Sequence, residues 1–453
     1  MRLFAIRDYR LLFSAQVIAL FGTGLATVAL GLLAYDLAGP DAGTVLGTAL
    51  TIKMVMYVVI APLAAAHADR FPRRTLLVLL DAARAAVVLA LPFVTDVWHI
   101  YLLIGLLQAS SAAFTPTFQA VIPDIVTDPA SYTRALSASQ VAYTMESLLS
   151  PVLAALALTF MTFDRLFLGT SAGFLLSALL VLSTRIPDAR PTGHTRARDN
   201  AAAGIRTFLT TPRLRGVMAL NLVVAAAGSI VVVNTVNHVR DGLGGSQSDV
   251  ARMLAASGTG TLLAALALPR ILDRIPARTV MTAGAAVLTA ATTAAATLTA
   301  TGTATWTATA IVWTVIGTGT ALVITPTGNV LRASVPPDTL PTAFAAQFSL
   351  SHLAWLITYP IAGWLGTNTG LTPTWTLLAV LAATGTTGAL LLWPRHDPPH
   401  TTTDHHHDQR QTTTGPPTPP QHHTDSITLD TAAQKTAAHD RAAQDRAALD
   451  KAA

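Results

Sequence analysis

Apolar stretches long enough to cross a bilayer recur along this chain from residue 11 to residue 393. A helical span needs roughly 20 predominantly apolar residues, because the hydrocarbon core is about 30 Å thick. Hydrophobic residues make up 51% of the 453 residues and charged residues only 12%, whereas soluble domains carry about 25% charged residues. The chain is therefore predicted to be a multi-pass, all-α membrane protein whose main partner is the lipid bilayer.

Proline, glycine and charged residues divide the apolar sequence into segments of helical length. This punctuation predicts twelve transmembrane helices. We expect them at 11–35, 44–66, 75–95, 99–122, 134–160, 165–184, 214–238, 249–271, 279–300, 305–330, 341–366 and 372–393.

The arginines fall in the short connections between these segments and form no patch, so we expect no nucleic-acid partner. If the N-terminus is cytoplasmic, eighteen arginines lie in inside connections and three, Arg165, Arg240 and Arg252, lie outside. This bias follows the positive-inside rule and predicts that both termini are cytoplasmic. The first residues run directly into a full-length span, and no cleavable signal peptide is visible.

Two short matches indicate an internal repeat. DRFPRR (Asp69–Arg74) is followed 204 residues later by DRIPAR (Asp273–Arg278), and Thr115-Pro116-Thr117 is followed 210 residues later by Thr325-Pro326-Thr327. Paired bundles with a binding site between them are a common architecture of transporters. The repeat predicts two pseudo-symmetric six-helix bundles. We expect a first bundle at 1–185, a cytoplasmic loop at 186–213, a second bundle at 214–394 and a cytoplasmic tail at 395–453.

The segment from Asp69 to Arg74 resembles the signature loop between the second and third helices of the major facilitator superfamily, G-x-x-x-D-R-x-G-R-R, with Pro72 in place of the second glycine. An aspartate here can meet a helix N-terminus of the other half, and the arginines can pair with Asp81. The resemblance implies a twelve-helix fold with a gate at this loop. The alternative is that these charges only set topology. The predicted gate residues are Asp69, Arg70, Arg73, Arg74, Asp81, Arg84, Asp273 and Arg274.

Ionisable residues inside a bilayer are costly and usually face the bundle interior. Glu146 lies 12 residues after Arg134, which is about 18 Å along a helix, and His352 has a similar depth in the eleventh segment. The two could face one cavity and bind a divalent cation, exchange protons, or both. Alternatively, each is a single polar residue that a neighbour satisfies.

Four further groups have two interpretations each. Lys53 lies in the outer third of the second segment, where it either joins the transport site or extends to the outer surface. Asp36 ends the first segment and is either a coupling residue or a loop charge. Gln16 and Asn221 either line a cavity or hold helices together, as do Asn234, Asn237 and His238.

The C-terminal segment is rich in histidine. Seven of the 13 histidines lie within 28 residues, with aspartates between them, and the final residues repeat every five positions. Imidazoles and carboxylates suit nickel, cobalt, zinc or copper, although a chance of composition is the alternative. The predicted metal ligands are His400, His405, His406, His407, His422 and His423. Since a period of five holds no single helical face, residues 432–453 are predicted to be a solvated helix or disordered.

The stretches RDYRLLFSAQVIALFGTGLATVALGLLAYDLAG and VIPDIV resemble the nickel/cobalt-resistance exporters of the same superfamily, which also end in a histidine-rich tail. This resemblance implies a bacterial inner-membrane antiporter that expels the cation in exchange for protons. The same framework resembles drug and siderophore exporters, whose organic substrates would need a roomier, aromatic-lined cavity. A metal-sensing membrane protein that transports nothing is a third possibility.

Several other function classes find no support in the sequence. The chain has no cysteine, which excludes disulfides and thiolate metal sites. It also lacks the H-E-x-x-H, G-x-S-x-G and P-loop motifs. We therefore expect neither an enzyme nor a bound cofactor.

Overall fold

The computed structural model describes residues 3–67, 72–126, 128–186, 195–336 and 339–395. Internal contacts divide the chain into two units, Met1–His400 and Thr401–Ala453. All the described residues belong to the first unit. The predicted tail ligands, from His400 to His423, lie outside the described residues.

The first half consists of six long helices joined by short turns. The helix α5 begins at Pro129, and the Asp128 side chain caps it by accepting a 2.9 Å hydrogen bond from the Ser131 amide. The elements are η1 (Leu3–Ala5), α1 (Arg7–Ala38), η2 (Gly39–Asp41), α2 (Ala42–His67), α3 (Arg73–Ala90), η4 (Leu91–Phe93), α4 (Val97–Ile125), α5 (Pro129–Leu158) and α6 (Phe163–Leu182).

The second half repeats this plan, with π-helical turns in its first and fifth segments. The elements are α8 (Pro212–Ser229), η5 (Ile230–Asn234), α9 (Thr235–Asn237), η6 (His238–Gly242), α10 (Gln247–Leu272), α11 (Ala277–Ala300), α12 (Trp306–Ser334), α13 (Leu340–Pro360), η7 (Ile361–Leu365), α14 (Gly366–Thr369) and α15 (Leu371–Leu392). The connection predicted as a loop contains a further helix, α7 (Thr195–Thr210), which packs on α8 and α13.

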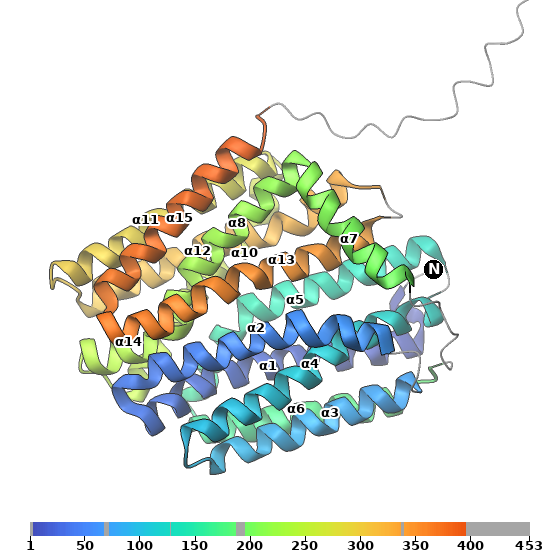
Figure 1. The fold of residues 1–453 in the computed structure, drawn as a ribbon, viewed down its shortest axis with the longest axis horizontal. Coiled ribbons are helices and arrows are strands. Elements are labelled where there is room, and N and C mark those ends of the chain that lie inside the picture. The colour runs from blue at the N-terminus through green and yellow to red at the C-terminus, as the bar shows by residue number, and fades with distance from the viewer. Residues whose placement is uncertain (1–2, 68–71, 127, 187–194, 337–338, 396–453) are drawn as a thin grey trace, which may run out of the picture. The chain divides into compact units, whose positions relative to one another are not determined.

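Helix packing is the same in the two halves. In the first, α1 packs on α6, α2 on α4, and α3 on both α4 and α6. In the second, α8 packs on α15, α10 on α12, and α11 on both α12 and α15. The halves meet where α5 contacts α10 and where α2 contacts α13 (Figure 1). The described residues therefore confirm the predicted fold, twelve long helices in two pseudo-symmetric bundles.

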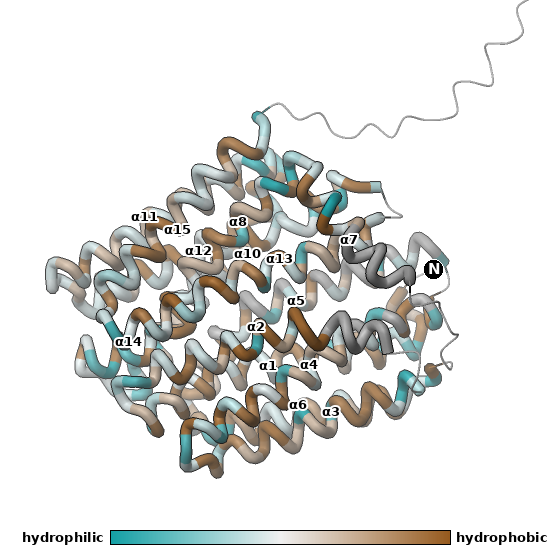
Figure 2. Tube along the Cα trace, viewed as in Figure 1, coloured by the Kyte–Doolittle hydropathy of each residue, from teal (hydrophilic) through white to brown (hydrophobic). Residues whose placement is uncertain are grey.

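The long helices have the composition of membrane spans. Nine stretches of the described residues are long and apolar enough to cross a bilayer, and the first runs through α1 and most of α2. Large apolar side chains such as Leu79, Leu266 and Leu391 are 61%, 63% and 79% exposed. Figure 2 shows apolar residues along the helices and hydrophilic ones gathered near their ends. These exposed side chains suit contact with lipid rather than water.

The halves are bonded to each other at one end of the bundle, here called the closed end, where α1 ends and α2 begins. The Tyr35 hydroxyl donates a 2.5 Å hydrogen bond to Asp241, and the Asn237 amide donates a 2.9 Å bond to the Pro40 carbonyl. Next to them, Gly47 of α2 lies against Gly363 of η7 so closely that a Cβ on either would overlap the other's backbone. The opposite end, called the arginine-rich end, contains Arg73, Arg74, Arg213 and Arg274.

Candidate functional site

A cavity of about 400 Å³ lies between the two halves. Helices α1 to α5 supply one side of it, and α8, η5, α9, α10, α12 and α13 supply the other. Its polar and aromatic lining residues are Gln16, Thr23, Thr27, Lys53, Tyr57, Arg84, Ser111, Phe114, Thr115, Tyr143, Glu146, Ser150, Asn221, Thr235, Thr327, Gln347, Phe348, Ser351, His352, Trp355 and Tyr359.

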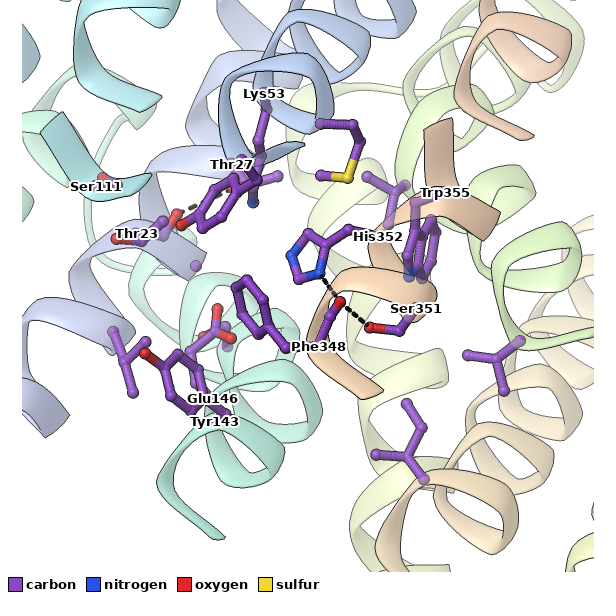
Figure 3. A pocket seen from close by; sticks show the side chains of 18 of the residues that line it. Thr23, Thr27, Lys53, Ser111, Tyr143, Glu146, Phe348, Ser351, His352 and Trp355 are labelled. Carbon is purple, nitrogen blue, oxygen red and sulfur yellow. Dashed lines mark hydrogen bonds between the residues drawn. The ribbon is translucent and has the colours of Figure 1, made fainter. Parts of the chain in front are cut away.

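Glu146 and His352 both line this cavity, one from α5 and the other from α13 (Figure 3). The Phe348 ring lies between them, with its centroid 4.1 Å from that of the imidazole. The His352 Nδ1 atom is 2.6 Å from the Phe348 carbonyl oxygen. Because a carbonyl only accepts, Nδ1 carries a proton, and in the neutral imidazole Nε2 is then an acceptor. The structure thus brings the two predicted residues into one cavity, and their role in coupling stays a prediction.

Lys53 also lines the cavity and interacts electrostatically with Glu146 (Figure 3). The interpretation that this side chain extends to the outer surface is therefore wrong. Its position in the outer third of a helix allowed both directions, and the Glu146 carboxylate in the cavity favours the inner one.

Arg84 and Asp81 form a buried ion pair within α3. Asp81 is 0% exposed and also accepts a 2.7 Å hydrogen bond from Ser177 of α6. The Arg84 guanidinium lies between the rings of Phe114 and Phe174, with its central carbon 4.1 and 4.6 Å from their centroids. The expected pairing of Asp81 with the loop arginines is wrong, because Arg84, three residues along the same helix, occupies that carboxylate.

The loop arginines have other partners. Arg73 pairs with Asp124 at the end of α4, and Arg74 donates to the Leu182 carbonyl at the end of α6. Asp69 and Arg70 lie outside the described residues. Asp273 and Arg274 are exposed after α10. These two contacts lie within the first half, and a gate at this loop remains a prediction.

Asp36 does not reach the cavity. It lies exposed near the end of α1, at the closed end, where it interacts electrostatically with Arg240. Asp36 thus lies outside the lining of this cavity, and its role in coupling stays a prediction. In the same region, the Arg240 guanidinium lies over the Tyr35 ring, 4.9 Å from its centroid.

Of the five polar residues with two interpretations, Gln16 and Asn221 line the cavity. Asn234, by contrast, donates a 2.8 Å hydrogen bond to the Ala362 carbonyl and accepts one of 3.1 Å from Trp375. His238 is buried 3.2 Å from Thr309. Asn237 belongs to the closed end. The last three residues therefore hold helices together.

Sequence reasoning missed the aromatic character of the cavity. Tyr57 lies 5.0 Å from His352 and 5.6 Å from Phe348, measured between ring centroids. Tyr143 lies 6.0 Å from Phe348, and Trp355 lies 4.9 Å from Tyr359. In the sequence, a single aromatic residue in an apolar helix cannot be told from one that faces lipid. Along α13, however, a ring recurs at every third or fourth residue, at Phe348, His352, Trp355 and Tyr359, and this spacing could have indicated a common face.

No three histidine, aspartate or glutamate side chains come together to form a metal site within the described ranges. The histidines of the tail fall outside these ranges. Among the described residues that line the cavity there is one carboxylate, Glu146, and one imidazole, His352, and they lie on opposite sides of the Phe348 ring.

The sequence is similar to a known protein family and to a bacterial membrane protein. The profile of the Major Facilitator Superfamily matches residues 12–237 and 217–429. An uncharacterized MFS-type transporter of Bacillus subtilis, YfiS, is 24% identical over 369 residues, which cover 79% of this chain and 87% of that protein.

Solved structures share the fold at low sequence identity. The nucleoside transporter NupG has a TM-score of 0.61 and 13% identity, with 85% of this chain and 100% of that chain covered. A POT family transporter has a TM-score of 0.66 and 13% identity, with 86% and 96% covered. At these identities, the similarity shows the fold alone.

Proposed function

The chain belongs to the Major Facilitator Superfamily, and on this premise we propose that it carries a small organic molecule across the bacterial inner membrane by alternating access. The observation that carries this proposal is the aromatic lining of the cavity between the halves. Tyr57, Phe348 and Trp355 offer large apolar faces, and polar groups between them can orient a ligand. This is the kind of cavity that an organic substrate needs.

The closed end supports the alternating-access mechanism. Hydrogen bonds and close glycine packing join the halves there. In the predicted orientation, with the arginine-rich end in the cytoplasm, this conformation is closed toward the outside. Movement of residues 1–185 against 214–394 would separate Tyr35 from Asp241 and open the cavity to that side.

Glu146 is proposed as the group that exchanges protons during transport. It faces the cavity beside Lys53, a cation that can stabilise its charged form. A proton that neutralises Glu146 also changes the charge that faces the substrate, which couples the two bindings. Export is the proposed direction, in line with the resemblance to resistance exporters.

Export of nickel or cobalt is a second candidate. One observation favours it: Glu146 and His352 line the same cavity, and His352 keeps its Nε2 atom as a possible ligand. It ranks second because the Phe348 ring lies between the two groups, whereas a metal ion needs its ligands at about 2 Å.

One experiment separates the two candidates. An efflux-deficient bacterium expressing the full chain is exposed in parallel to nickel, cobalt, zinc and two unrelated aromatic drugs, and the cellular content of each is measured. We expect less of a drug and unchanged metals, with the difference abolished by collapsing the proton gradient and by Glu146→Gln. Lower nickel or cobalt with unchanged drugs would overturn the organic proposal and establish the metal one.

A further inference from the structure

Among the described residues on the first half's side of the cavity, four side-chain hydrogen-bond donors have no acceptor. One of them, the Ser150 hydroxyl, lies beside the Glu146 carboxylate, which leaves three. They are Nε2 of Gln16, Nε of Arg84 and the Ser111 hydroxyl. Each of the three residues lines the cavity, and their exposed fractions are 2%, 3% and 3%. They come from α1, α3 and α4, so three separate helices contribute these residues to the lining of one cavity.

Two of the three donors, those of Gln16 and Arg84, are fixed by contacts that the same side chains make elsewhere. The Gln16 amide oxygen accepts a 3.0 Å hydrogen bond from Ser139, so its nitrogen faces the Tyr143 hydroxyl, without a bond of normal geometry. The Arg84 guanidinium is held by Asp81 and by two phenylalanine rings, which leaves its Nε free. A buried donor without an acceptor destabilises the protein, because it has lost its hydrogen bonds to water. A ligand that supplies acceptors would offset this destabilisation.

The second half's side of the cavity has fewer charged and unbonded polar groups than the first half's side. Among the described residues that line the cavity, those of the second half include no aspartate, glutamate, lysine or arginine. Their two amides satisfy each other, since Asn221 donates to Gln347 at 3.3 Å and Gln347 donates back at 3.1 Å. This side therefore offers mainly the aromatic surface of Phe348, His352 and Trp355.

We infer that Gln16, Arg84 and Ser111 form a subsite for an anionic oxygen group of the substrate, and that the substrate is an aromatic carboxylic acid. A carboxylate accepts several hydrogen bonds and binds strongly to charged donors. Lys53 adds a positive charge to the same cavity, which offsets the negative charge of the Glu146 carboxylate. The aromatic part of the acid then lies against the second half. This inference rests on the proposed function and specifies its substrate class.

Three probes with one ring system test the subsite. Indole-3-acetate, indole-3-acetamide and tryptamine differ in carrying a carboxylate, a neutral amide and an ammonium group. Binding to the purified full chain is measured by ligand-induced thermal stabilisation, with nickel chloride as a separate arm. We expect the acid to bind roughly 10-fold or more tightly than the amide, because a hydrogen bond to a charged group is worth about 1.5–3 kcal/mol.

Two variants locate the effect, each with a matched control in the second half. Ser111→Ala should lower the acid-to-amide affinity ratio, whereas Ser351→Ala, whose hydroxyl already donates to the Phe348 carbonyl at 2.8 Å, should not. Gln16→Glu replaces a donor with a negative charge and should abolish the preference for the acid, whereas Gln347→Glu should reduce it less. Size-exclusion profiles check that each variant is folded.

The outcomes separate the inference from the proposed function. Equal or tighter binding of the amide or the amine would overturn the anionic subsite and leave an organic substrate in place. An equal loss of acid preference in Ser111→Ala and Ser351→Ala would also overturn the subsite. Binding of nickel alone, with none of the three organic probes, would overturn both the subsite and the organic transporter.

Discussion

Equivalent positions of the two halves differ most at one turn of α3 and its counterpart α11. The repeat of 204 residues relates Asp81 to Ala285 and Arg84 to Leu288. All four are buried, with exposures of 0%, 0%, 3% and 0% in that order. The same packing of these helices on their neighbours thus accommodates an ion pair in one half and two apolar side chains in the other.

This difference shows that the fold does not need the ion pair. Replacing a buried ion pair by well-packed apolar residues is often neutral or stabilising, whereas removing one partner is strongly destabilising. The second half holds its helices together at these positions with alanine and leucine alone. The charges of the first half, Arg84 above all, therefore have their explanation on the cavity side rather than in helix packing.

The largest expected effect concerns Glu146, the residue of the cavity to which we assign proton exchange. Glu146→Gln keeps the shape of the side chain and removes its titration, so transport should fall to the background of cells that lack the protein. His352→Gln is the matched change in the second half and should lower transport only in part. The measurement is substrate content in energised cells, corrected for the amount of protein in the membrane.

Equal losses in the two variants would contradict this difference between the halves, since they would give the imidazole the same weight as the carboxylate. Undiminished transport by Glu146→Gln would remove Glu146 from the coupling site altogether.

The second prediction concerns stability. Asp81→Ala leaves the Arg84 charge buried without its partner and should lower the free energy of unfolding by about 3–5 kcal/mol. The midpoint of thermal unfolding of the purified protein in detergent measures this loss. Asp273→Ala removes an exposed aspartate and serves as the control, with a change near zero. A loss no greater than that of the control would mean that the Arg84 charge is satisfied without Asp81.

The third prediction copies the second half into the first. The double variant Asp81→Ala with Arg84→Leu removes both charges together and should recover most of the stability that Asp81→Ala loses, to within about 1.5 kcal/mol of the native chain. Its preference for indole-3-acetate over the amide should nevertheless be lost, because the Arg84 donor is gone. A double variant that is as unstable as Asp81→Ala alone would show that the ion pair is needed for packing.

The architecture could be predicted from the sequence, whereas much of the site could not. Apolar runs of one helical length, separated by arginines and prolines, predict the number of helices, and the two short repeats predict the symmetry of the halves. Glu146 and His352 stood out because ionisable residues are rare inside a bilayer. Their common cavity followed from their similar depth.

The sequence alone did not determine direction or pairing. Depth along a helix does not say which way Lys53 points, and rarity alone cannot separate a cavity charge from Asp36 at a helix end. The partner of Asp81 depended on three-dimensional spacing, in which a residue three positions along the same helix is closer than the loop. The free donors of Gln16 and Ser111 could not be predicted, since they depend on what their neighbours leave unbonded.

The smallest expected effect concerns the hydrogen bond from Tyr35 to Asp241, one of those that join the halves at the closed end. Tyr35→Phe removes the hydroxyl that donates to Asp241. The variant should therefore favour the conformation in which the halves are separated at this end and the cavity is open to the outside. Because the chain has no cysteine, a single Thr27→Cys change places one reporter in the cavity lining. Its labelling by a membrane-impermeant thiol reagent from outside should become roughly two- to tenfold faster, the range expected for one hydrogen bond of about 0.5–1.5 kcal/mol.

Tyr132→Phe is the control, because it removes a hydroxyl from α5 near the arginine-rich end, within the first half. Faster labelling in the control would mean that loosening either end opens the cavity, and the bond to Asp241 would then have no special part. Unchanged labelling in both would assign the closure to the contacts that remain, among them the hydrogen bond from Asn237 to the Pro40 carbonyl and the close packing of Gly47 against Gly363. Both involve backbone atoms, so side-chain charge would then have no part in joining two halves that differ in charge.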